Sequence, residues 1–302
     1  MKNRVNFTNI HPIIVLMFGA ICISFAPIFV KLIDSALLGP TVIGLWRVVL
    51  GSVILFIWSK LAGNSIKLSK RMFIFATVAG FLFSLDLFFW HRSIFYSGAG
   101  MATILANTQV FTTAILSYFV FKERLSILFF VVALSAMGGV VLLVGVGSDV
   151  EFTKKYLEGI FFGVATGIVY ACYIVILKHA GEKEEKPKML TLLAWVSLMT
   201  GLFLFLISLI EQVPLLPPDF YHWVVLFLLA LVAQSVGWWA ISSSILKIEG
   251  SQSGLILLLQ PVLATIWGIV FLAEHLKSVQ IIGAVVTLGA IYIGSAFRTM
   301  KK

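Results

Sequence analysis

The sequence has 302 residues, of which 60% are hydrophobic and 12% are charged, and its mean hydropathy is +1.06. A soluble domain carries about twice that fraction of charged residues, so the composition excludes a soluble protein and indicates an integral membrane protein. Lys and Arg number 22 against 13 Asp and Glu, a net charge of +9. We interpret this excess as basic loops on one side of a membrane and expect no nucleic-acid partner, because no soluble basic domain remains.

Apolar stretches of about 20 residues, the length that crosses the hydrocarbon core of a bilayer, follow one another along the chain. Gly, Pro and charged residues separate them, and no connecting loop is long enough for a soluble domain. The first stretch lacks a small-residue cleavage site, so we expect a retained span and not a signal peptide. The predicted transmembrane helices are 11–31, 40–60, 72–91, 98–121, 125–147, 157–178, 189–210, 221–246, 252–273 and 277–297.

The basic residues outside these ten predicted spans are distributed unevenly between the two membrane faces. If both termini are cytoplasmic, most of the Lys and Arg residues lie in cytoplasmic segments. Those on the opposite side are Lys31, Arg92, Lys154, Lys155 and Lys277. The positive-inside rule favours this orientation. We therefore expect a multi-pass protein of the cell inner (plasma) membrane with both termini in the cytoplasm.

The two halves of the chain are similar in sequence. The segment "FVFKERLSILFFVVALSAMGGVVLL" matches "FLAEHLKSVQIIGAVVTLGAIYIG" at an offset of 151 residues, which aligns Glu123 with Glu274. The same offset aligns Gln109 with Gln260.

An odd number of helices in each half determines the relative orientation of the two copies. Because each half has five predicted spans, the second copy must lie upside down relative to the first. We therefore predict an all-α polytopic membrane protein of two inverted five-helix repeats, residues 1–150 and 151–302. Two halves related in this way can rock about a shared cavity and expose it to each side in turn.

The paired segments, with Gln109 in the span before the first and "LLLQPVLATIWGIVF" before the second, resemble the two EamA repeats of the drug/metabolite transporter superfamily. The resemblance covers nearly the whole chain. It implies a ten-helix inner-membrane transporter, often an exporter of amino acids or other metabolites, with a central cavity lined by both halves. Members commonly have few ionisable groups in the third span, so Asp86 departs from the family pattern.

Asp86 lies in the apolar run "SLDLFFWHRSIF" (84–95). A charge at the bilayer centre costs roughly 2.5 to 3.5 kcal/mol on insertion scales, so Asp86 needs a partner, water or a proton. One interpretation is an ion pair with Arg47 of the second predicted span, while His91 and Arg92 snorkel to the headgroups. The alternative is that Asp86 faces the cavity and binds a cationic substrate group or accepts a coupling proton.

Polar and aromatic residues in other spans are further candidates. Gln109 and Gln260 either hydrogen-bond between helices or both contact substrate. Pro261 frees a backbone carbonyl one turn earlier, a feature of helices that line transporter cavities. We expect one of Trp238 and Trp239 to face the cavity, where it could stack on a planar or cationic substrate. The candidate substrate or coupling residues are Arg47, Asp86, His91, Asn107, Gln109, Trp238, Trp239 and Gln260.

Two further patterns indicate structural roles. Glu123 and Glu274 end the fourth and ninth predicted spans just before the next helix, so we expect them to cap and fix the turn, because a helix N-terminus favours negative charge. Gly163 and Gly167 belong to a stripe of small residues at intervals of four, which predicts close helix packing.

The sequence has no metalloprotease, serine-hydrolase or phosphate-loop motif and no His/Cys cluster with metal-ligand spacing. We therefore expect no metal, no cofactor and no enzymatic activity. The predicted function is secondary transport of a small metabolite, an amino acid or related compound, in the export direction by alternating access. A membrane-embedded enzyme using Asp86 and His91, or a passive channel, stays an alternative.

Overall fold

The computed structural model describes residues 11–33, 37–97, 99–123, 125–144, 153–181, 188–272 and 278–299, and every regular element within them is a helix. The elements of the first half are α1 (Pro12–Ser24), α2 (Ala26–Lys31), α3 (Pro40–Leu61), α4 (Lys70–Ser97), α5 (Ala99–Asn107), α6 (Gln109–Phe121) and α7 (Ile127–Val144). Those of the second half are α8 (Lys154–Gly181), α9 (Met189–Glu211), α10 (Phe220–Leu228), η2 (Leu229–Gly237), α11 (Trp238–Ile245), α12 (Gly250–Leu257), α13 (Leu259–Leu272) and α14 (Ser278–Thr299).

Seven of the predicted spans are confirmed as helical segments long and apolar enough to cross a membrane. They are Pro12–Lys31, Pro40–Leu61, Lys70–Ser97, Ile104–Phe121, Lys154–Ala180, Met189–Glu211 and Phe220–Ile245. The three other predicted stretches are also helical: α7 and α14 contain the shorter apolar helices Ile127–Leu142 and Ile281–Gly294, and α12 with α13 forms the remaining one. The chain is therefore a multi-pass membrane protein.

The outer surface agrees with a lipid environment. Large apolar side chains on several helices are exposed, among them Phe161, Ile210 and Ile127, at 67%, 82% and 85%. A water-soluble monomer rarely exposes contiguous apolar patches of this kind, whereas lipid tails solvate them without cost.

Backbone interruptions divide three of the long helical segments. α1 and α2 meet at Phe25, α5 and α6 meet at Thr108, and α12 and α13 meet at Leu258, three residues before Pro261. A fourth segment is continuous but is wound as the π-helix η2 at its centre. Irregular backbone at membrane depth is tolerated where it is buried in protein or lines a cavity, and π-helices are frequent at functional sites.

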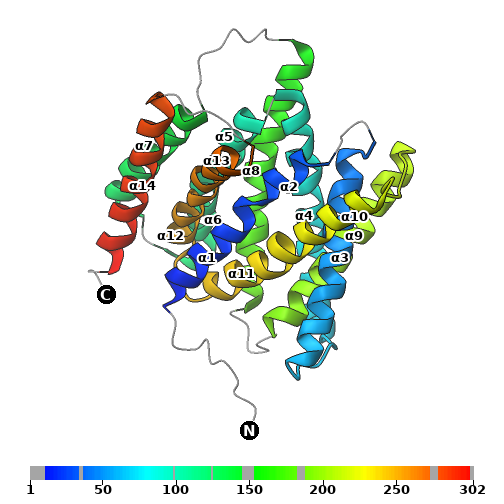
Figure 1. Cartoon of the computed structure of the whole chain (residues 1–302). Helices are drawn as coiled ribbons and strands as arrows, with labels where there is room; N and C mark the ends of the chain where they lie inside the picture. The colour runs from blue at the N-terminus through cyan, green and yellow to red at the C-terminus, as the bar shows by residue number, and fades with distance from the viewer. Residues whose placement is uncertain are drawn as a thin grey trace.

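The helices form a bundle whose two edges are helix pairs (Figure 1). α7 packs against α14 at one edge of the view, and α3 packs against α9 at the other. Between these pairs, α4 packs against α8, and α1 packs against η2 and α11. The interrupted helices lie between the two edge pairs (Figure 1).

The small-residue stripe of α8 faces α5. A Cβ atom added to Gly163 would lie 2.7 Å from Cβ of Leu105, and one added to Gly167 would lie 3.1 Å from the carbonyl oxygen of Ala106. These distances are shorter than ordinary van der Waals contacts, so the two helices reach their present separation because glycine occupies both positions.

Candidate functional site

A cavity of about 120 Å³ lies where the interrupted helices meet. A cavity that holds one buried water molecule has a volume of about 10 to 15 Å³ when it is measured in the same way. This cavity is therefore large enough for a small organic molecule. It is lined by residues at all three interruptions, by residues of α4 between Phe83 and Trp90, by two residues of α8, and by one residue each of α3 and α11. The walls therefore come from both halves of the chain.

Asp86 and Arg47 both line this cavity. They are 7% and 4% exposed and lie within electrostatic range of each other, but no contact ion pair or hydrogen bond joins them in the part of the chain that the structure describes. The Nε of Arg47 instead donates to Oε1 of Gln234 at 3.1 Å, and Gln234 donates to Oγ of Ser197 at 3.0 Å. Asp86 thus faces the cavity. Arg47 also lines the cavity, and its guanidinium is held by the hydrogen bond to Gln234 of η2.

The two repeat-equivalent glutamines line the same cavity without bonding to each other. Nε2 of Gln109 donates to the carbonyl oxygen of Gly254 at 3.2 Å, and its Oε1 accepts from Thr113 at 2.9 Å, so this amide links α6 to α12. Gln260 lies next to Tyr170, but its Nε2 is buried and has no hydrogen-bond partner among the described residues. The direct Gln109–Gln260 hydrogen bond considered from the sequence is therefore replaced by a side-chain to backbone contact.

Of the two adjacent tryptophans, Trp238 lines the cavity and Trp239 does not. Trp238 is 2% exposed, and its ring meets Phe83, Tyr170 and Tyr173 edge to face at centroid distances of 5.1, 5.8 and 5.0 Å. Trp239 packs beside Trp58 of α3. An aromatic cluster therefore forms one wall of the cavity.

The other predicted residues divide into two groups. Asn107 and Pro261 line the cavity at two of the helix interruptions. His91 does not: it is 1% exposed, its Nδ1 lies 2.7 Å from the carbonyl oxygen of Leu87, and its ring packs where a Cβ on Gly44 would contact it.

The interpretation in which His91 and Arg92 snorkel to the headgroups does not fit the burial of His91. α4 continues to Ser97, beyond the predicted end of the span at residue 91. His91 faces α3, and Arg92 forms an ion pair with Glu211 of α9 and lies over the ring of Phe88.

Several cavity residues were missed by the sequence analysis. Thr166 and Tyr170 of α8, Phe83 of α4 and Ser24 beside the α1–α2 interruption all line the cavity. Tyr170 and Thr166 are four residues apart and therefore share one face of α8, a spacing that could have indicated a common surface.

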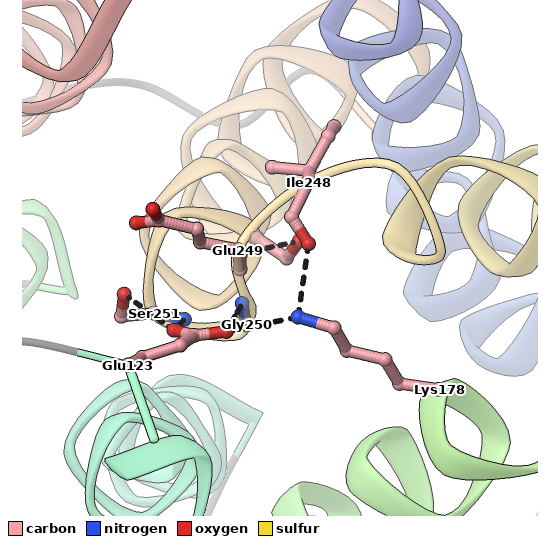
Figure 2. A network of polar contacts seen from close by, with 7 residues as sticks. Glu123, Lys178, Ile248, Glu249, Gly250 and Ser251 are labelled. Carbon is pink, nitrogen blue, oxygen red and sulfur yellow. Dashed lines mark hydrogen bonds and ion pairs between the residues drawn. The ribbon is translucent and has the colours of Figure 1, made fainter. Parts of the chain in front are cut away.

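A second polar cluster lies away from the cavity and joins α6, α8 and α12 (Figure 2). Oε1 of Glu123 accepts from Nζ of Lys178 at 2.8 Å and from the backbone N–H of Gly250 at 2.6 Å. Oε2 accepts from the backbone N–H and the hydroxyl of Ser251 at 3.2 and 3.1 Å. Lys178 also donates to the carbonyl oxygen of Ile248 at 3.1 Å. We call these five residues the Glu123–Lys178 network.

The network corrects the role expected of Glu123. Among the described residues, the carboxylate accepts no hydrogen bond from the helix that follows it in sequence. It instead caps the N-terminus of α12, because α6 and α12 pack side by side. Burial raises the pKa of Glu123, but hydrogen bonds from Lys178, Gly250 and Ser251 outweigh it, and the pKa is lower than its ordinary value. Its repeat equivalent, Glu274, lies outside the described residues.

A family model described as the EamA-like transporter family matches residues 11–145 and 157–295. The chain belongs to the EamA-like transporter family. This EamA membership, with the membrane-spanning helices, identifies a membrane transporter protein and favours transport over enzymatic catalysis. The chain carries two successive matches to the same EamA model, as the internal sequence similarity predicts.

Curated EamA-like relatives are distant in sequence. A probable amino-acid metabolite efflux pump of Salmonella typhimurium and one of Escherichia coli are each 26% identical over 65% of this chain and 67% of their own length. A WAT1-related chloroplastic protein of Arabidopsis thaliana is 28% identical, and the match spans about half (48%) of that protein. A protein of known crystal structure superposes with a TM-score of 0.81 over 96% of this chain and 99% of its own, at 16% identity, which shows a shared fold.

Proposed function

We propose that this EamA-family chain is a secondary transporter that exports a small zwitterionic metabolite, an amino acid or a related compound, by alternating access. The observation that carries the proposal is the pair Asp86 and Arg47, which share one cavity without a contact ion pair. A ligand with an ammonium and a carboxylate group is complementary to two such charges, each of which is costly to bury alone. The names of the Salmonella and Escherichia relatives support this substrate class and the export direction.

The aromatic wall and the amides define the rest of the proposed site. The rings beside Trp238 would contact the apolar part of the substrate, while Gln109, Gln260 and Asn107 supply polar groups at the helix interruptions. Asp86 would bind the ammonium group or take up a coupling proton when the substrate leaves. Pro261 would keep the interrupted backbone of α12 and α13 open toward the substrate.

The architecture proposed for this transport is ten spans in two inverted repeats, 1–150 and 151–302. The three helical segments α7, α12–α13 and α14 complete the ten. Packing supports the symmetry, because spans five positions apart pair with each other: α3 with α9, α6 with α12 and α7 with α14. The α4–α8 contact likewise corresponds to the α1–α11 contact when the halves are exchanged.

The Glu123–Lys178 network would close the cytoplasmic end of this transporter. With both termini in the cytoplasm of the inner membrane, α6 and α8 end, and α12 begins, at the cytoplasmic face. Gly250 precedes Gln260 by ten residues, about 15 Å at 1.5 Å per residue, so the network lies one helix segment below the cavity. Alternating access would then require these hydrogen bonds to break when the cavity opens to the cytoplasm.

Purified protein in liposomes tests the proposal. We expect saturable counterflow of radiolabelled L-amino acids by the native chain and at least a tenfold lower rate for Asp86→Asn. Asp219→Asn is the matched control, because Asp219 is an exposed carboxylate that caps α10 outside the cavity. Flux that does not saturate would indicate a channel, and chemical conversion of the labelled compound would indicate an enzyme. Unchanged counterflow by a folded Asp86→Asn protein would contradict the role of Asp86.

A further inference from the structure

We propose that the indole N–H of Trp238 and the amide of Gln260 form a donor pair that recognises the acceptor oxygen atoms of the substrate. The inference rests on the proposed function and assigns two specificity-determining residues within it. Nε1 of Trp238 and Nε2 of Gln260 are both buried, and within the described ranges neither has a hydrogen-bond partner. Both residues line the cavity.

Three other tryptophans in the described part of the chain donate their indole N–H groups to protein acceptors. Nε1 of Trp46 donates to the carbonyl oxygen of Leu215 at 2.6 Å, and Nε1 of Trp195 donates to that of Ile66 at 2.8 Å. Nε1 of Trp267 donates to the hydroxyl of Ser24 at 2.7 Å. A buried indole N–H ordinarily finds a partner, so the free donor of Trp238 indicates that its acceptor enters the cavity from outside the protein.

Aromatic side chains surround the two donors. Trp238 meets three aromatic rings edge to face, and one of these rings, that of Tyr170, also neighbours Gln260. Both nitrogen atoms are closed off from bulk water. Because neither nitrogen has a partner among the described residues and both side chains line the cavity, we expect a bound molecule to supply the acceptor.

The charged residues of the cavity indicate which functional groups the bound substrate carries. Asp86 offers acceptor oxygens and no donor in its ionised form, so it complements the ammonium group of a zwitterion. Arg47 has its Nε committed to Gln234. Trp238 and Gln260 add two neutral donors that suit a carboxylate or a carboxamide and discriminate against a simple amine, because a site built for an acceptor leaves its donors unpaired when the acceptor is missing.

A comparison of two probes tests the donor pair. L-Phenylalanine carries the carboxylate, and 2-phenylethylamine is the same molecule without it. We expect Trp238→Phe, which removes the N–H but keeps an aromatic ring, to weaken L-phenylalanine binding by about tenfold to a hundredfold, the range for a hydrogen bond to a charged group. Binding of 2-phenylethylamine should change by less than about twofold. Gln260→Leu should show the same selectivity.

Trp239→Phe is the matched control, because the neighbouring ring lies outside the cavity, and it should change neither affinity. Equal weakening of both probes by Trp238→Phe would mean that the indole acts through packing, and no weakening of either would also overturn the inference. If the native protein binds neither probe in titration calorimetry, the proposed substrate class fails instead of the donor assignment. Thermal unfolding of each ligand-free variant verifies that it is folded.

Discussion

Nζ of Lys178 and Oε1 of Glu123 lie 2.8 Å apart, and both side chains are more than nine-tenths buried. A buried ion pair is maintained when further hydrogen bonds compensate the loss of hydration, and here three donors of α12 and one backbone carbonyl supply them. The pair therefore connects three helices that come from both halves of the chain.

Lys178→Met removes the cation of this pair and leaves the Glu123 carboxylate buried without its counter-charge. We expect the free energy of unfolding to fall by about 3 to 5 kcal/mol, the usual cost of breaking one side of a buried pair. Thermal unfolding in detergent would show a lower melting temperature. Lys155→Met, at the exposed opposite end of the same helix, is the control and should have little effect. A double variant with Glu123→Gln should recover part of the loss, and identical melting of all four proteins would contradict the assignment.

The same carboxylate predicts how stability depends on pH. The folded-state pKa of Glu123 is below its ordinary value of 4.5, so the stabilisation is fully present above pH 4.5 and is lost as the pH falls through the folded-state pKa. The melting temperature of the native protein should therefore fall more steeply below pH 4.5 than that of Glu123→Gln. If the melting temperatures of the two proteins depend on pH in the same way, the hydrogen bonds at Glu123 do not make stability depend on pH.

Chemical labelling of loops tests the inverted repeats. The α3–α4 loop and the α9–α10 loop occupy equivalent places in the two proposed copies, so they should lie on opposite membrane faces. We expect a membrane-impermeant maleimide to label Leu216→Cys from outside the cell and Lys67→Cys after the membrane is permeabilised. Cys22 and Cys172 would first be replaced by Ala. Labelling of both positions from the same side would rule out an inverted arrangement.

Two adjacent glycines of α7 provide a matched test of the α7–α14 contact. A Cβ added at Gly139 would lie 2.8 Å from the carbonyl oxygen of Gly283, whereas one added at Gly138 meets nothing within 4 Å. Gly139→Ala should lower the melting temperature, because backbone atoms of α14 must move. Gly138→Ala should keep or raise it, since Ala is favoured over Gly in a helix by up to about 1 kcal/mol. Destabilisation of equal size would mean that helix separation does not depend on Gly139.

Hydrophobicity alone located the seven confirmed spans, because a bilayer requires about 20 apolar residues per crossing regardless of the neighbouring helices. The EamA resemblance was also recoverable from the duplicated segments, since these retain residues at a constant offset. Each apolar span is a local property of the sequence, and the EamA segments occur twice within it. The sequence therefore predicted the family and the seven helical segments that are long and apolar enough to cross a membrane.

Contacts between distant residues were less predictable. Glu123 serves α12, which begins 127 residues later in the chain, and the periodicity of a single helix does not specify such a partner. His91 was placed at the interface because the length of α4 was underestimated. The candidate list nevertheless contained most of the polar residues around the cavity, because polar side chains are scarce inside apolar spans and tend to face a common interior.

The π-helix η2 carries Gln234 and ends directly before Trp238. A π-helix rotates successive residues through a smaller angle than an α-helix does, so its winding sets the azimuth of every side chain that follows it. Unwinding or tightening η2 would turn α11 about its own axis and move Trp238 away from Phe83 while Trp239 changes its orientation too. The backbone torsions of the nine residues before Trp238 thus determine which of the two indoles borders the cavity. Gln234 lies in this segment and accepts a hydrogen bond from Arg47, so the winding of η2 is coupled to the position of the guanidinium in the cavity.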